Sequence, residues 1–203
     1  MPRLPRPRLA DMPFHVIQRG NNRAACFFCD GDRRRYLEDL RIQALRHGVS
    51  VHAYVLMTNH VHLLVTAREP EGVSKLMKFV GQLYAQYVNR RYERSGSSWD
   101  GRFHSRLIDS ESYLLQCHRY VECNPVRASM VRHPGAYRWS SYRANALGAP
   151  DPLVTPHPLI RALGRTDAES QAAYRELFLQ ELESAFVDHV RGGRRRPKLN
   201  GGV

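Results

Sequence analysis

The feature that most constrains the fold is a pair of apolar segments that follow one another almost without a gap. Residues 51–57 and 60–66 each have the length and composition of a strand. Because only Thr58 and Asn59 separate them, the two strands must pair as a hairpin. Any fold for this chain has to contain that hairpin.

Strands and helices alternate on both sides of the hairpin. In chain order we expect a strand at 14–18, a helix at 32–47, the two hairpin strands, a helix at 73–92 and a strand at 102–108. Gly48 is expected to stop the first helix. The order β-α-β-β-α-β predicts an α+β, ferredoxin-like fold: an antiparallel sheet with both helices on one face and the other face open.

Two histidines, His60 and His62, begin the second strand of the hairpin. Side chains alternate along a strand, so both imidazoles project from one face while Val61, Leu63 and Val65 point into a core. On the open face of the sheet, two neighbouring imidazoles are two ligands of a divalent-metal site that needs a third. The pair can also arise by chance in a chain with 10 histidines.

A further helix is expected from residue 110 or 111 to 122 or 123, with Ser110 as its cap and an end imposed by Pro125. Its polar stripe contains four residues at helical spacing, Tyr113, Gln116, Tyr120 and Asn124. One interpretation is a partly exposed helix with hydrated tyrosine hydroxyls. The other is a catalytic helix laid across the open sheet face, which presents Tyr120 and Asn124 to the two histidines.

Several motifs together resemble a known family. They are the segments 18–23, 59–65, 99–106, 113–127 and 137–142. Over about residues 12–148 the chain resembles the single-tyrosine HUH transposases, and among them the REP-associated tyrosine transposases. The resemblance implies a metal-dependent nuclease and strand transferase for single-stranded DNA that binds palindromic hairpins. It also implies that Tyr120 is the nucleophile and Asn124 the third metal ligand, although some relatives have glutamine there.

Neutral imidazoles and an amide oxygen suit an exchangeable Mg²⁺ or Mn²⁺ ion. Tyr113 is the rival nucleophile, but only Tyr120 has an amide four residues later to share the metal. We therefore expect DNA nicking and joining through a 5′-phosphotyrosine, in transposition or mobilisation of REP elements. The alternatives are a non-catalytic protein, derived from a transposase, that binds hairpin nucleic acid, and a phosphohydrolase that uses water.

The net charge of +12 and the sequence pI of about 10.1 favour a polyanionic partner, above all nucleic acid. Candidate phosphate contacts are Arg3, Arg6, Arg8, Arg19, Arg23, Arg102, Arg106, Arg194 and Arg195. Each of them can instead be a solvated surface charge. Three aromatic residues, Tyr54, Phe103 and Trp139, can stack on bases, but core positions are the favoured interpretation.

The chain divides into a basic flexible arm (1–11), the transposase domain (12–148), a helical extension (149–190) and a basic disordered tail (191–203). In the extension a proline-marked linker precedes helices at 157–163 and 167–190. The extension can pack on the domain, pair with a second subunit or contact DNA.

Without a signal peptide or a membrane span we expect a cytoplasmic protein, monomeric or homodimeric. Because the tyrosine helix starts directly after the fourth strand, we favour a site completed within one chain. The Cys26-x-x-Cys29 pair allows a zinc or redox site, but reduced thiols are the favoured interpretation.

Overall fold

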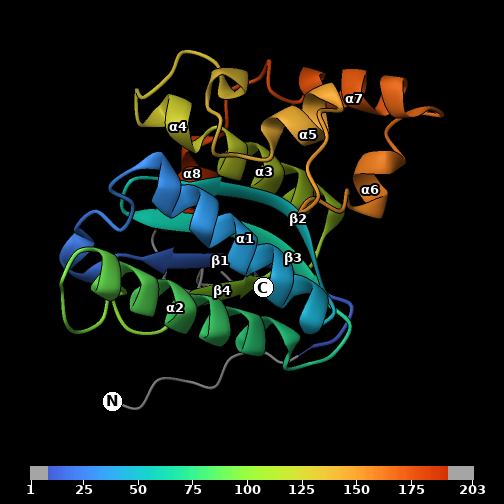
Figure 1. Cartoon of the computed structure of the whole chain (residues 1–203). Helices are drawn as coiled ribbons and strands as arrows, with labels where there is room; N and C mark the ends of the chain where they lie inside the picture. The colour runs from blue at the N-terminus through green and yellow to red at the C-terminus, as the bar shows by residue number, and fades with distance from the viewer. Residues whose placement is uncertain (1–8, 192–203) are drawn as a thin grey trace, which may run out of the picture.

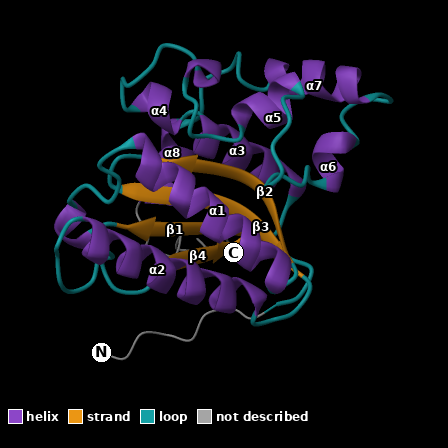
Figure 2. Cartoon of the chain, viewed as in Figure 1, coloured by secondary structure: helices purple, strands orange, loops and turns teal. Residues whose placement is uncertain are grey.

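The computed structural model describes residues 9–191, and its centre is a four-stranded antiparallel sheet with helices on both faces (Figures 1 and 2). The strands are β1 (Pro13–Arg19), β2 (Val49–Leu56), β3 (His60–Ala67) and β4 (His104–Leu107). They lie in the order β2-β3-β1-β4, so β1 and β3 are the central strands. This order confirms the ferredoxin-like topology expected from the sequence.

Two long helices, α1 (Asp30–Arg46) and α2 (Gly72–Arg91), pack side by side on one face of the sheet (Figure 2). Their buried residues include Tyr36, Leu40, Leu76, Val80 and Tyr84. Gly48, with φ of +60°, follows the end of α1, as expected of a residue that stops a helix. Val61, Leu63 and Val65 of β3 are buried on the face of the sheet that these helices cover.

The third long helix, α3 (Glu111–Glu122), lies across the other face of the sheet and contacts β2 and β3. Ser110 caps it by accepting a hydrogen bond from the Tyr113 N–H group at 3.3 Å. The helix ends before Pro125, and a single turn, α4 (Asn124–Arg127), follows with Pro125 in its first turn. The open sheet face is therefore covered by the helix that carries Tyr120.

The remaining elements are short. They are η1 (Asn21–Arg23), η2 (Pro134–Ala136), α5 (Tyr142–Leu147), α6 (Pro158–Arg161), α7 (Asp167–Glu176) and α8 (Ser184–Arg191). The single helix expected at 167–190 is wrong, since α7 and α8 are separated by residues 177–183. Tyr174 of α7 is buried near α5, whereas Phe186 of α8 packs against Tyr113. A single straight helix would not place Tyr174 near α5 and Phe186 against Tyr113.

The proline-rich segment expected to be a linker lies instead along the edge strand β2. Val154 forms a parallel bridge with Val51, and the Thr155 N–H group donates to the Val51 carbonyl at 2.8 Å. The Tyr54 hydroxyl also donates to Asp151 at 2.8 Å. These contacts hold the start of the extension against the sheet.

The candidate stacking residues Tyr54, Phe103 and Trp139 are all buried in the core, which confirms the core interpretation. The cysteines are all free thiols. Within residues 9–191 no group of three or more His, Cys, Asp or Glu side chains is arranged to hold a metal. In the same range no helix is long and apolar enough to cross a membrane.

Candidate active site

A pocket opens between the ends of β1 and β3 on one side and α3 and α4 on the other. It is lined by Ile17, Arg19, Met57, His60, His62, Tyr120, Asn124, Arg127, Ala128 and Val190. The two histidines, the tyrosine and the asparagine singled out from the sequence thus line one pocket of a single chain. The short connection between β4 and α3 brings the tyrosine helix back over its own sheet.

The two histidines are held by their Nδ1 atoms. Nδ1 of His60 lies 2.7 Å from Oδ1 of Asn59, and Nδ1 of His62 lies 2.9 Å from Nε2 of His15. Nε2 of His60 is therefore the nitrogen left for a cation, and the same holds for His62 when its Nδ1 carries the proton shared with His15. Metal-binding histidines are typically held in this way by a partner on the second nitrogen.

Burial favours the neutral form of both rings by lowering the pKa of each imidazole. Burial, with the charge of Arg19, lowers the pKa of His60 to about 4. Burial also lowers the pKa of His62 well below its usual value, and the neighbouring His15 and His60 lower it further. The neutral imidazole is the form that binds a metal.

Asn124 lines the same pocket as the two histidines. Its Nδ2 atom donates to the Tyr120 carbonyl oxygen at 2.9 Å, and this identifies Oδ1 as the end that can bind a cation. Two imidazole nitrogens and one amide oxygen then face one pocket and fit a divalent ion such as Mg²⁺ or Mn²⁺. The reach of this short side chain is set by the turn from α3 into α4.

Tyr120 lies beside the histidines. Its ring is edge-on to His62, with 5.5 Å between ring centroids, and edge-on to His15 at 5.9 Å. Within residues 9–191 no hydrogen bond engages its hydroxyl. The hydroxyl oxygen that is expected to attack the DNA phosphorus is therefore not hydrogen-bonded to a neighbouring side chain.

Tyr113, the rival nucleophile, does not line this pocket. Its hydroxyl accepts a hydrogen bond of 3.4 Å from Arg106, and its ring packs against Phe186. The geometry therefore favours Tyr120 over Tyr113 as the residue that shares a site with the histidines.

Two residues of the site were missed in the sequence. The Arg127 guanidinium carbon lies 4.9 Å from the centre of the Tyr120 ring, and its Nη1 atom is buried without a partner in the described chain. Arg127 is seven residues after Tyr120, so helical spacing was a usable signal. His15 shares a face of β1 with Arg19, but its contact with His62 depends on strand register.

A buried cluster of polar side chains around Glu122 anchors α3. Oε1 of Glu122 accepts hydrogen bonds from Ser141 Oγ at 2.6 Å and Asn145 Nδ2 at 2.9 Å, while Oε2 accepts one from the Tyr174 hydroxyl at 2.8 Å. Burial raises the pKa of Glu122 to about 7, against the opposing effect of these hydrogen bonds. The cluster ties the helix that carries Tyr120 to α5 and α7.

The C-terminal helix α8 covers part of the site. Phe186 packs edge-on against Tyr113 and Tyr120, with centroid distances of 5.5 and 6.2 Å. Val190 lines the pocket itself. Figure 1 shows α8 beside α3. The extension therefore packs on the rest of the chain, which is one of the three roles considered for it.

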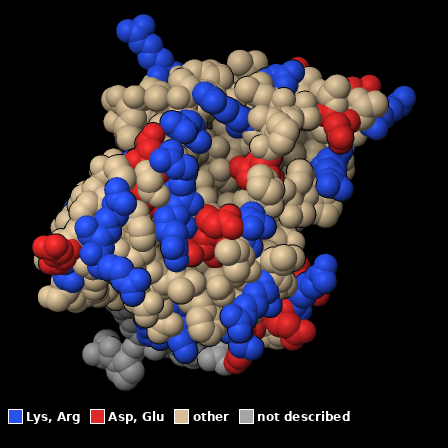
Figure 3. All heavy atoms as spheres, viewed as in Figure 1, with Lys and Arg blue, Asp and Glu red and all other residues tan. Residues whose placement is uncertain are grey.

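The candidate phosphate contacts fall into three groups. Arg19 lines the pocket. Three others lie outside its lining: Arg23 and Arg102 are exposed, and Arg106 of β4 is half-buried. The others, Arg3, Arg6, Arg8, Arg194 and Arg195, lie outside the described residues. Figure 3 shows Lys and Arg side chains gathered over the side of the molecule that carries α1 and α2. None of these arginines is thereby shown to bind DNA.

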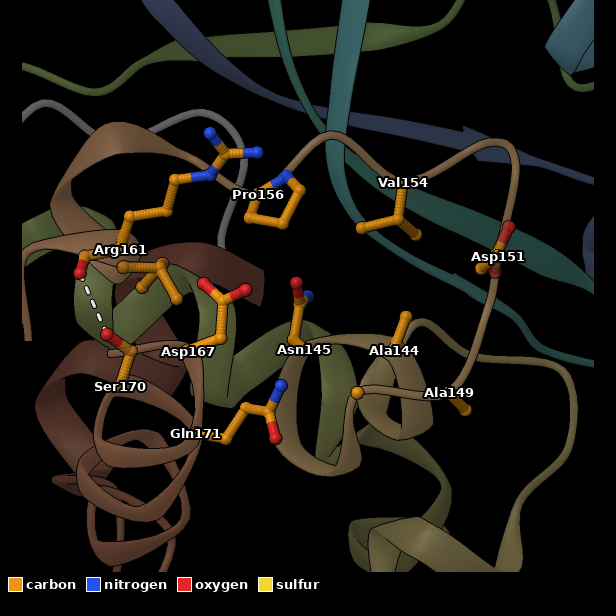
Figure 4. Close-up of a pocket in the computed structure, with 12 residues that line it drawn as sticks. Ala144, Asn145, Ala149, Asp151, Val154, Pro156, Arg161, Asp167, Ser170 and Gln171 are labelled. Atoms are coloured by element: carbon orange, nitrogen blue, oxygen red, sulfur yellow. Dashed lines mark hydrogen bonds between the residues drawn. The ribbon is translucent and has the colours of Figure 1, made fainter. Parts of the chain in front are cut away.

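A separate pocket lies among α5, α6, α7 and the segment before α6 (Figure 4). Polar residues such as Asn145, Arg161, Asp167 and Gln171 line it, and the Ser170 hydroxyl donates to the Arg161 carbonyl at 2.8 Å. None of the residues proposed from the sequence for metal, nucleophile or DNA lines this pocket. It belongs to the packing of the extension.

The chain belongs to the IS200-like transposase family, whose model matches residues 9–124. It is accordingly an enzyme of the transposase class, which cleaves and joins DNA.

One solved structure, of a REP-associated tyrosine transposase bound to a REP hairpin, matches with a TM-score of 0.64 and 14% identity, over 77% of this chain and 93% of that chain. A protein from Deinococcus radiodurans assigned as a transposase matches with a TM-score of 0.42 and 21% identity, over 59% of this chain and 95% of that chain. No curated protein matches the chain. The first likeness supports the fold.

Proposed function

We propose that this protein is a metal-dependent endonuclease and strand transferase for single-stranded DNA that uses Tyr120 as its nucleophile. Its substrate is palindromic hairpin DNA of the REP type, and its biological role is transposition or mobilisation of such elements. The observation that best supports this proposal is the placement of Tyr120 in one pocket with His60, His62 and Asn124.

The reaction follows from the chemistry of the phenol. The Tyr120 oxygen attacks the scissile phosphorus, the bond from phosphorus to the 3′-oxygen breaks, and the phenol proton is lost to solvent while the 3′-oxygen takes one up. The product is a 5′-phosphotyrosine and a free 3′-hydroxyl. A different 3′-hydroxyl reverses the step and joins the strands without an external energy source.

The chain's own residues have distinct tasks in this step. His60, His62 and Asn124 would hold a Mg²⁺ or Mn²⁺ ion, which when bound polarises the phosphate and offsets developing negative charge. Arg127 would contact a phosphate oxygen through its unpartnered Nη1 atom while its guanidinium lies over the Tyr120 ring. Arg19, on the opposite wall of the pocket, would grip the neighbouring phosphate.

The hairpin substrate is supported by the solved structure that shares this fold, which was determined with a REP hairpin. The excess of cations, +12 in formal charge, supports a nucleic-acid partner of either single-stranded or hairpin form. A non-catalytic role in hairpin binding is the second candidate, and the cover of α8 over Tyr120 is the observation that favours it.

Formation of a covalent protein–DNA adduct distinguishes the strand transferase from the non-catalytic hairpin-binding protein. The purified protein is incubated with a 5′-labelled or 3′-labelled hairpin oligonucleotide with a single-stranded flank, with Mn²⁺, Mg²⁺ or a chelator. We expect a denaturant-resistant complex with the 3′ part of the DNA in the presence of metal, and its loss in Tyr120→Phe but not in Tyr113→Phe. An adduct that persists in Tyr120→Phe contradicts the nucleophile. Tight hairpin binding without any adduct supports the second candidate.

A further inference from the structure

We propose that His15 is a positioning residue of the metal site, because it accepts the Nδ1 proton of His62 and thereby leaves the Nε2 lone pair of His62 for the cation. This inference rests on the proposed metal-binding role of His62. It adds a third histidine to the site, one that does not itself touch the ion.

The sheet places the two rings together. In the antiparallel register of β1 and β3, Ile17 lies opposite His62 and His15 opposite Leu64, so His15 and His62 are diagonal neighbours on one face. Their rings are stacked, with centroids 5.1 Å apart and planes inclined by 14°. His15 Nε2 and His62 Nδ1 are 2.9 Å apart, which is a hydrogen-bond distance.

One proton lies between these two nitrogens, and its position decides whether His62 can bind a metal. If His62 carries it on Nδ1, Nε2 of His62 has a lone pair and His15 holds its own proton on Nδ1. If His15 carries it on Nε2, the neutral His62 ring must have its proton on Nε2, where it blocks the cation. The distance between the two nitrogens is the same in both tautomers. Which tautomer forms therefore depends on whether the partner of His62 donates or accepts the proton.

His60 provides the comparison within the same site. Its Nδ1 faces Oδ1 of Asn59, and the amide is oriented because Nδ2 of Asn59 donates to the Arg23 carbonyl at 2.8 Å. An amide oxygen only accepts, so it fixes His60 with its proton on Nδ1. His62 instead has a partner that can donate or accept. His15 therefore admits two tautomers of the pair, and we assign the one in which Nδ1 of His62 donates to Nε2 of His15.

His15 is suited to this role by its environment. Its side chain is only 2% exposed, so the hydrogen bond to His62 is shielded from solvent. A neutral imidazole has one nitrogen that accepts a proton and one that donates. The edge-on contact of His15 with Tyr120 also places the same side chain against the nucleophile.

The first arm of the test measures the wild-type protein and uses a variant only to assign the signals. The apoprotein is labelled with ¹⁵N at histidine, and long-range ¹H–¹⁵N spectra identify which nitrogen of each neutral ring carries the proton, with His62→Gln used for assignment. We expect His62 to carry its proton on Nδ1 and His15 on Nδ1. A His62 ring with its proton on Nε2 in the metal-free wild type would overturn the proposal.

The second arm measures Mn²⁺ affinity by electron paramagnetic resonance, without DNA. His15→Phe keeps an aromatic ring but removes the acceptor, and we expect a loss of affinity of about 10–100-fold. His15→Gln places an amide oxygen near the former Nε2 and is expected to restore most of the loss. Wild-type affinity in folded His15→Phe would also overturn the proposal.

His52→Phe is the matched control. His52 is an equally buried histidine, hydrogen-bonded to Thr155 and Thr66, and contacts no residue of the site. We expect it to lose stability but not Mn²⁺ affinity, and a loss equal to that of His15→Phe would contradict a specific role for His15. If the wild type binds no Mn²⁺ at all, the proposed function is refuted, whereas the ¹⁵N spectra still decide the role of His15.

Discussion

Replacing Glu122 with glutamine is expected to remove a pH dependence from the stability of the protein. Glu122 is fully buried and its pKa is raised to about 7 by that burial. In the unfolded chain a glutamate has its ordinary pKa of about 4.3. The folded state therefore holds a proton that the unfolded state releases at lower pH.

The sign and size of the effect follow from these two values. Between the unfolded and the folded pKa the native state binds more protons, so the free energy of unfolding falls as pH rises. The slope is about 1.4 kcal/mol per pH unit, and over the interval this amounts to about 4 kcal/mol. Below about pH 4 the contribution is constant, and above about pH 8 the loss is complete. Glutamine has no titratable carboxyl group, so the Glu122→Gln variant lacks this pH dependence.

The assay is urea unfolding of wild type and Glu122→Gln at several pH values from 4 to 8. We expect the variant to gain stability relative to wild type as pH rises, by about 4 kcal/mol across the range. Glu176→Gln, which changes an exposed glutamate of α7, serves as the control and is expected to show no such trend. A difference between Glu122→Gln and wild type that is the same at every pH would refute the reasoning.

Three further outcomes are expected. Arg127→Gln should slow single-turnover formation of the DNA adduct about 100-fold, because it removes a cation from the reacting phosphate, and an unchanged rate would exclude that contact. Arg102→Ala should lower the slope of log affinity against log salt by about 1 in fluorescence-anisotropy titrations with hairpin DNA, and an identical slope would leave Arg102 a surface charge. Phe186→Ala should loosen α8 and speed adduct formation by Tyr120, whereas slower formation would show that α8 supports the site.

The parts of the fold that the sequence predicted are those governed by local patterns. The two-residue gap between the strands expected at 51–57 and 60–66 allowed only a hairpin, and the alternation of elements around it led to the observed sheet. Helical spacing placed Tyr120 and Asn124 on one stripe, and strand alternation placed His60 and His62 on one face. Pocket geometry then brought these two pairs together.

The parts that the sequence did not predict depend on contacts between distant segments. The role of His15 requires the register of β1 against β3, which no local pattern specifies. The segment around Val154 looked like a linker because of its prolines, but its backbone pairs with the edge of β2. The break between α7 and α8 follows from two different packing partners. Propensity alone favours one continuous helix there.

The central claim is that Tyr120 forms the covalent bond with DNA in a site built by one chain. The most direct measurement is mass spectrometry of the protease-digested adduct, formed with Mn²⁺ on a hairpin oligonucleotide, to identify the residue that carries the nucleotide. We expect the nucleotide on Tyr120, in the peptide that also contains Asn124, and the adduct to be absent in a chelator. A nucleotide on Tyr113 or any other residue, or an adduct that forms equally well without metal, would contradict the account.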